Sequence, residues 1–97
     1  MATYIILVSY TQEGIQKVKD SPKRLDGVKT LARKFGAELT DFYLCMGAYD
    51  IIVIVQAPDD QTLAKFVLAA SSLGYIRTTT VRAFNETEYR EIIQSLP

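Results

Sequence analysis

Residues 46–55 read Met46-Gly47-Ala48-Tyr49-Asp50-Ile51-Ile52-Val53-Ile54-Val55, a small turn that runs directly into the most apolar segment of the chain. Glycine favours turns, and a β-branched run is typical of a strand. The segment before the turn also has strand character, so we predict a tight hairpin of strands 37–46 and 49–57 joined by Gly47-Ala48. The carboxylate at the head of the apolar strand must be solvated, hydrogen-bonded or paired, because burying it bare is costly.

Two further strands are predicted outside this hairpin, at residues 3–10 and 75–84. The segment 4–8 is apolar at both parities, which predicts a central strand with apolar side chains on both faces. In strand 49–57 the side chains also divide between two apolar faces. Simple alternation in strand 37–46 places Leu39, Tyr43 and Cys45 on one face and Phe42, Leu44 and Met46 on the other.

Helical spacing of apolar residues joins these strands. A helix is expected from Thr11, a capping residue, to Gly36, with a kink at Asp20-Ser21-Pro22 where Ser21 could cap a second segment. A second helix is expected from Pro58 to Gly74. A short last helix opens on Asn85 and Glu88, in a capping-box arrangement. Its apolar side consists of Tyr89, Ile92, Ile93 and Leu96.

The resulting order, βαββαβ plus a C-terminal helix, predicts a ferredoxin-like α+β fold formed by one domain over residues 1–97. The sheet should have four antiparallel strands, with both long helices on one face. The other face then carries uncovered apolar side chains, which marks an interface. Two sheets packed face to face in a homodimer would bury it, giving a dimeric α+β barrel. The alternative is that the last helix folds across this face.

The composition restricts the chemistry. The chain has 97 residues, eleven basic and eleven acidic side chains, and no histidine. Zero net charge argues against nucleic-acid binding, and the lack of histidine removes the usual general base and transition-metal ligand. We therefore expect no metal and no cofactor. No apolar run is long enough for a membrane span and no signal peptide is recognised, so a cytoplasmic location is expected. Cys45, the one cysteine, is expected to be a buried side chain inside a strand.

Six residues are candidates for ligand binding: Tyr49, Asp50, Arg77, Thr78, Tyr10 and Arg24. Asp50 could receive a ligand ammonium group or act as a base beside Tyr49, or it could anchor the backbone of the turn. In strand 75–84, Thr78 shares a face with Thr80 and Arg82, and Arg77 points to the other face. Such groups suit a carboxylate or phosphate, or else form a polar edge strand that resists aggregation.

Arg24 and Tyr10 are the outer candidates. Arg24 lies next to the expected kink in the first helix, where it could reach a cleft between helix and sheet or remain solvated. Tyr10 ends the first strand and could line the same cleft, or could be a core or interface aromatic residue.

Five ordered motifs resemble the GYD-domain family, which takes its name from a Gly-x-Tyr-Asp turn. They are Tyr10-Thr11-Gln12-Glu13-Gly14, Ser21-Pro22-Lys23-Arg24, Gly47-Ala48-Tyr49-Asp50, Ala57-Pro58-Asp59-Asp60 and Gly74 to Phe84. The resemblance covers almost the whole chain and implies a dimeric α+β barrel more than any activity. Gln56, Tyr75 and Thr79 depart from the family pattern, which has Glu, Asn and Glu there. If those positions line a pocket, this chain is expected to bind a different ligand from other members, or none.

The second half, residues 47–84, is similar to the effector-sensing domain of leucine-responsive-type transcription regulators. The shared features are the Gly-x-Tyr-Asp hairpin, a helix opened by Asp with a Leu-x-x-Phe core, and a Gly-x-x-x-Thr-x-Thr strand. This resemblance implies amino-acid binding near the hairpin, at contacts between dimers. The chain has no helix-turn-helix with which to read DNA.

These observations favour a small cytoplasmic homodimer, or a higher oligomer, that binds an amino-acid-like or anionic metabolite between sheet and helices. One alternative is a cofactor-independent enzyme, such as a monooxygenase or isomerase, in which Asp50 moves a proton and Tyr49 or an arginine steadies the anion. Another is a structural protein that binds a partner without any ligand. No catalytic residue is assigned.

Overall fold

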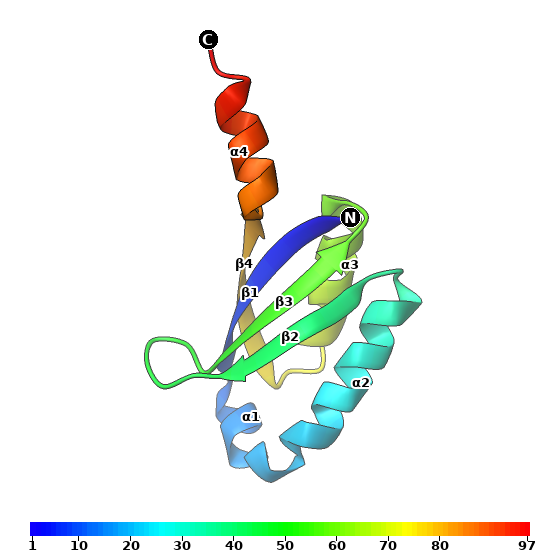
Figure 1. Cartoon of the computed structure of the whole chain (residues 1–97). Helices are drawn as coiled ribbons and strands as arrows, with labels where there is room; N and C mark the ends of the chain where they lie inside the picture. Colours follow the sequence, from blue (N-terminus) through cyan, green and yellow to red (C-terminus); the bar gives the residue numbers. More distant parts are fainter.

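A computed structural model describes residues 1–97 (Figure 1). Along the chain, a helix pair separates the first strand from a hairpin, and a second long helix leads to the last strand. The elements are β1 (Ala2–Tyr10), α1 (Gln12–Gln16), η1 (Val18–Asp20), α2 (Ser21–Lys34), β2 (Glu38–Leu44), β3 (Ile51–Ala57), α3 (Asp60–Ser71), β4 (Ile76–Ala83) and α4 (Glu86–Gln94). None of these helices combines the length and the hydropathy needed to cross a lipid bilayer.

The four strands form one antiparallel sheet in the order β2-β3-β1-β4. β1 is central and pairs with β3 on one side and with β4 on the other. Helices α2 and α3 lie on the same side of the sheet (Figure 1). The predicted ferredoxin-like βαββαβ arrangement is therefore confirmed, as an open sheet and not a closed barrel.

The predicted helix ends are mostly confirmed. Thr11 caps α1 by accepting a hydrogen bond from the Gly14 backbone N–H, and Asn85 and Glu88 form the complete capping box of α4. Gly36, just after α2, takes the left-handed conformation with φ of 78°. The kink is present as η1, but Ser21 is not a capping residue: α2 begins at Ser21 itself, and Asp20 before it makes no capping hydrogen bond.

The prediction for the two faces of β2 was wrong, because a β-bulge interrupts the alternation. The register shifts between Leu39 and Asp41, so that Leu39 opposes Val55 and Phe42 opposes Val53. A bulge adds one extra residue to a strand, so two residues that are three positions apart, such as Leu39 and Phe42, can point to the same face. Leu39, Phe42 and Leu44 consequently all point toward the helices, and Tyr43 points away from them.

The hairpin is longer than predicted. β2 ends at Leu44 and β3 begins at Ile51, so six residues connect them instead of a tight Gly47-Ala48 turn. The loop projects from the sheet (Figure 1), and the side chain of Met46 is fully exposed. Cys45 lies in this loop and is half-buried, not inside a strand.

The core lies between the helix-covered face of the sheet and α3. Alternate residues of β1 and β3 point into it, with Leu63, Phe66 and Ala70 of α3 packed against them. By contrast α2 has one buried residue, Ala32, among its fourteen. Thus α3 packs closely on the sheet, whereas the apolar residues Leu25, Val28 and Leu31 of α2 contact the core but are only partly buried.

The opposite face of the sheet carries no helix and is called the open face here. The registers place Ile5, Leu7, Ile52, Ile54, Tyr43 and Val81 on it. Their alternation with the helix-facing residues confirms that the central strands are apolar on both faces. The last helix does not cover this face: α4 extends beyond the end of β4, away from the sheet (Figure 1).

Candidate functional site

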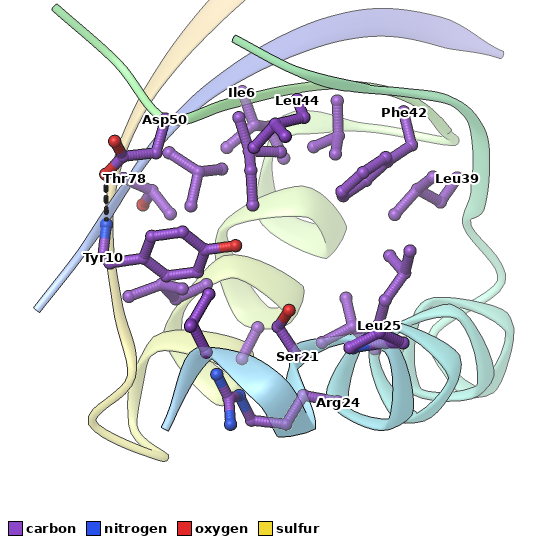
Figure 2. Close-up of a pocket in the computed structure, with 18 of the residues that line it drawn as sticks. Ile6, Tyr10, Ser21, Arg24, Leu25, Leu39, Phe42, Leu44, Asp50 and Thr78 are labelled. Atoms are coloured by element: carbon purple, nitrogen blue, oxygen red, sulfur yellow. Dashed lines mark hydrogen bonds between the residues drawn. The ribbon is translucent and has the colours of Figure 1, made fainter. Parts of the chain in front are cut away.

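A cavity of about 520 Å³ lies between the sheet and helices α1, η1, α2 and α3 (Figure 2). Its volume falls within the roughly 300–1,000 Å³ usual for small-molecule sites. Sixteen of its 21 lining residues are hydrophobic, so its walls favour an apolar occupant. It occupies the space beneath α2 that the core leaves unfilled. The apolar walls include Ile6, Val8, Leu25, Val28, Phe42, Leu44, Val53, Phe66 and Val67.

Four of the six predicted binding residues line this cavity: Tyr10, Arg24, Asp50 and Thr78. Figure 2 shows the hydroxyl of Tyr10 pointing into the space, with the hydroxyl of Ser21 directed toward it from the start of α2. Asp50 and Thr78 lie at the edge beside Tyr10. The polar groups that reach the cavity are thus mainly hydroxyls.

Asp50 connects β3 to the end of β1. One carboxylate oxygen accepts a hydrogen bond from the Tyr10 backbone N–H at 2.9 Å, and the Asp50 backbone N–H donates to the Val8 carbonyl at 2.9 Å. The Asp50 carbonyl also accepts from the backbone N–H of Cys45 at 2.8 Å, which closes the base of the hairpin loop. The carboxylate therefore continues the β1–β3 ladder by one further bond, as the anchor interpretation expects.

Replacing Asp50 by alanine should lower the free energy of unfolding by about 1–3 kcal/mol, because the Tyr10 N–H loses its acceptor. Asp50→Asn keeps a side-chain oxygen and should lose much less. Urea unfolding of both variants measures the difference, provided that the slope of the unfolding free energy against urea concentration is unchanged. Wild-type stability in both variants would contradict the anchor role.

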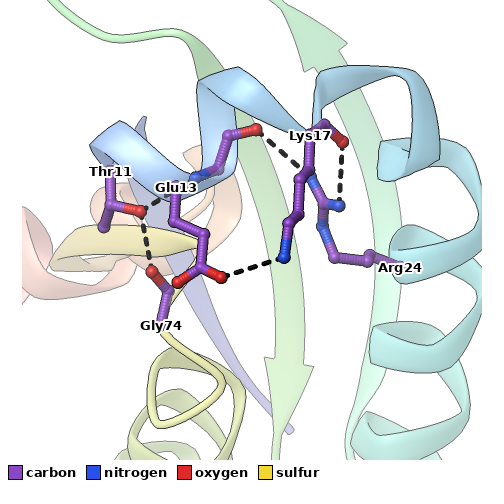
Figure 3. Close-up of polar contacts among 6 residues, drawn as sticks. Thr11, Glu13, Lys17, Arg24 and Gly74 are labelled. Carbon is purple, nitrogen blue, oxygen red and sulfur yellow. Dashed lines mark hydrogen bonds and ion pairs between the residues drawn. The ribbon is translucent and has the colours of Figure 1, made fainter.

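The guanidinium of Arg24 is already engaged by its own chain (Figure 3). It donates to the carbonyl of Lys17 at 3.0 Å and to the carbonyl of Gly14 at 3.5 Å, and it stacks 4.3 Å from the centre of the Tyr75 ring. Carbonyls at a helix C-terminus carry partial negative charge, which a cation stabilises. Arg24 thus fastens the end of α1 to α2 and to the chain entering β4, at the cavity edge.

The start of α1 touches the loop before β4 at very short range. The Thr11 backbone N–H donates to the Tyr75 carbonyl at 3.1 Å, and the Thr11 hydroxyl donates to the Gly74 carbonyl at 2.7 Å (Figure 3). A Cβ built on Gly14 would lie 2.0 Å from the Tyr75 carbonyl oxygen. Only glycine allows this approach, and the approach holds α1 over one end of the cavity.

Two predicted binding residues lie outside the cavity. Arg77 opposes Ser9 of β1 and is exposed on the open face, and Tyr49 lies half-buried in the hairpin loop. Sequence reasoning missed the apolar lining contributed by β2 and α2, because Phe42 was assigned to a face without regard to the bulge. Ser21 was considered only as a capping residue. Its position beside Pro22 at the kink was the signal from which a place for Ser21 at the cavity could have been predicted.

A separate polar cluster lies at the other end of β1. The Tyr4 hydroxyl donates to a carboxylate oxygen of Asp60, and the guanidinium of Arg82 lies 5.5 Å from the centre of the Tyr4 ring. Burial, with a smaller contribution from the hydrogen bond to Asp60, raises the pKa of Tyr4. Backbone and side-chain hydrogen bonding with Thr62 lowers the pKa of Asp59, the capping residue of α3. These contacts secure the start of α3. No group of three acidic or cysteine side chains is placed to hold a metal ion.

Comparison with known proteins supplies the family. The sequence profile of the GYD domain matches residues 4–93. A glutamine synthetase and cystathionine beta-lyase binding protein of Thermus thermophilus is 33% identical over 84 residues, which are 86% of this chain and 88% of that protein.

Two solved structures share the fold. A feast or famine regulatory protein of M. tuberculosis, solved with L-methionine, matches 88% of this chain at a TM-score of 0.68 and 14% identity. The match spans 51% of the regulator, about half its length. A protein of Thermus thermophilus with a crystal structure matches 88% of this chain and 95% of its own, at a TM-score of 0.57 and 22% identity.

Both resemblances seen in the sequence are thereby confirmed, the regulator likeness at the level of the fold. The ordered motifs, the ferredoxin-like sheet and the profile match over residues 4–93 agree: this chain belongs to the GYD domain family.

Proposed function

We propose that this protein is a cytoplasmic homodimeric binding protein that takes up a small, largely apolar molecule in the cavity between sheet and helices. The observation that carries the proposal is the cavity itself, about 520 Å³ with mostly hydrophobic walls. Water that fills such a cavity leaves the apolar side chains hydrated. A bound ligand instead gains about 25 cal/mol of binding free energy for each Å² of apolar surface that it removes from water.

The lining favours a neutral ligand over the anionic or amino-acid-like ligand expected from the sequence. The Arg24 guanidinium already donates to two carbonyls, and the Asp50 carboxylate would repel an anion. The hydroxyls of Tyr10 and Ser21 can donate to or accept from an uncharged polar group. We expect a ligand with an apolar body and one hydroxyl or carbonyl group directed at these two side chains.

A binding titration with 1-naphthol, a neutral aromatic compound with one hydroxyl, tests this proposal. We expect saturable binding and a raised melting temperature, and weaker or no binding of the anion 1-naphthoate. Ala70→Leu narrows the cavity and should weaken naphthol binding at least about tenfold. Ala64→Leu, on the exposed side of the same helix, is the matched control and should bind as wild type. Equal binding by the two variants would place the probe elsewhere and contradict the proposal.

The homodimer part of the proposal follows from the open face. Ile5, Leu7, Ile52 and Ile54 form a continuous, partly exposed apolar area on the two central strands, which no helix of their own chain covers. An exposed apolar area of this kind marks a contact surface. Two sheets packed open face to open face would leave both cavities accessible on the outer sides of the dimer.

A second candidate function is binding to an enzyme. The relative that is 33% identical is described as binding glutamine synthetase and cystathionine beta-lyase. The projecting loop with its exposed Met46 offers a surface for such contact. Size-exclusion chromatography of this protein mixed with either purified enzyme tests it: co-elution is expected, and Met46→Glu should reduce it. Separate elution from both enzymes would argue against this function.

A further inference from the structure

The C-terminal helix α4 presents an apolar side that nothing in its own chain covers. Tyr89, Ile92 and Ile93 of the helix, with Leu96 just beyond its end, are each between 42% and 59% exposed, and no residue of the helix is buried. The helix has nine residues. Isolated helices shorter than about 12–15 residues are marginal in water, even when composed of good helix formers. The capping box stabilises its start, but packing of the apolar side has to supply the rest.

The chain itself cannot supply that packing in this arrangement. Two residues, Phe84 and Asn85, connect β4 to α4, and the capping box fixes the direction in which the helix begins. From there α4 leads away from the sheet (Figure 1). Its apolar side therefore faces solvent in the single chain, as does the open face of the sheet.

The accessible surface area of the single chain indicates how much surface a partner would have to cover. The chain exposes 6583 Å², whereas a compact monomer of 10.9 kDa exposes about 5,600 Å². The excess of about 1,000 Å² is close to the roughly 800 Å² that each partner buries in a standard dimer interface. With zero formal net charge, two copies do not repel each other.

We propose that, where the two sheets face each other, α4 of one protomer packs its apolar side against the part of the partner's open face that the facing sheet leaves uncovered, so that the two helices are exchanged across the dimer. This inference rests on the homodimer of the proposed function and adds the role of α4. Each helix then covers apolar residues of its partner, and the interface extends beyond the two sheets. The ligand cavity, on the other side of the sheet, takes no part in it.

Sedimentation velocity at micromolar concentration tests the energetic role of α4. The wild-type protein should sediment as a species with a mass of twice 10.9 kDa. Ile92→Glu should weaken dimerisation about tenfold or more, because it places a charge in the apolar contact. Gln94→Glu adds the same charge to the polar side of the helix and should remain dimeric. Unchanged dimerisation of Ile92→Glu would overturn the role of α4.

A photo-cross-linking residue at position 92 tests where the helix packs. Equal amounts of ¹⁴N protein with the cross-linker and ¹⁵N wild-type protein are mixed, allowed to exchange and irradiated. Mass spectrometry should find ¹⁴N α4 peptides joined to ¹⁵N peptides of β1, β2 or β3. Cross-links confined to ¹⁴N–¹⁴N pairs would show that α4 packs on its own chain and would overturn the exchange. A wild type at 10.9 kDa would contradict the dimer itself, while naphthol binding tests the cavity separately.

Discussion

Gly14→Ala should strongly destabilise the protein. The added Cβ would lie 2.0 Å from the carbonyl oxygen of Tyr75, which belongs to the backbone and cannot rotate aside. Helix α1 must move away, and the two hydrogen bonds from Thr11 to Gly74 and Tyr75 are then lost or lengthened. We expect a loss of about 2–3 kcal/mol in the free energy of unfolding, in the upper part of the range for overpacked sites. Thermal and urea unfolding measure it.

Gly27→Ala is the matched control for this variant. Gly27 lies within α2, and a Cβ built there meets nothing within 4 Å. The same substitution should stabilise the protein by about 0.5–1 kcal/mol, because alanine restricts the unfolded chain and favours the helix. The two glycine variants should therefore change stability in opposite directions. A Gly14→Ala protein as stable as wild type would mean that α1 does not depend on its contact with Tyr75.

Ile5→Glu should convert the proposed dimer to a monomer. Ile5 is on the central strand, between Ile54 of β3 and Val81 of β4, near the middle of the open face. Burying a carboxylate between two apolar sheets costs several kcal/mol, which exceeds what one contact can restore. Sedimentation should show wild type at twice 10.9 kDa and the variant at 10.9 kDa.

Thr30→Glu provides the control for the Ile5 variant. Thr30 is exposed on α2, on the other side of the sheet, so the same charge there should leave the dimer intact. Circular dichroism distinguishes loss of the dimer from loss of the fold. If Ile5→Glu remains a dimer with wild-type affinity, the open face is not the contact surface.

The sequence predicted most of the fold because its local signals agree with one another. Thr11, Asn85 and Glu88 cap helices where their side chains would be expected to do so, and Gly36 follows the end of α2. Apolar residues at both parities of residues 4–8 correctly indicated that β1 is a central strand. Capping and periodicity depend on neighbours within a few residues, so they can be recognised without the tertiary structure.

The errors occurred where distant contacts determine the backbone. The bulge between Leu39 and Asp41 depends on the pairing of β2 with β3, and no local residue type announces it. Four residues proposed from the sequence line the cavity, namely Tyr10, Arg24, Asp50 and Thr78. The sequence did not identify the apolar walls of that cavity. Leu25, Val28 and Phe42 have the spacing of ordinary core residues, and only the tertiary packing of α2 and β2 makes them line a cavity.

The strand order has a consequence for the biosynthesis of the protein. β1 is synthesised first, yet one of its two partners is β4, which ends at Ala83. The sheet therefore cannot be completed until the whole segment from β1 to the end of β4 has been synthesised. Until then the apolar strand β1 lacks a neighbour on one side, a condition that favours aggregation. Folding is accordingly a late event, in which the last strand closes a sheet that began with the first residues.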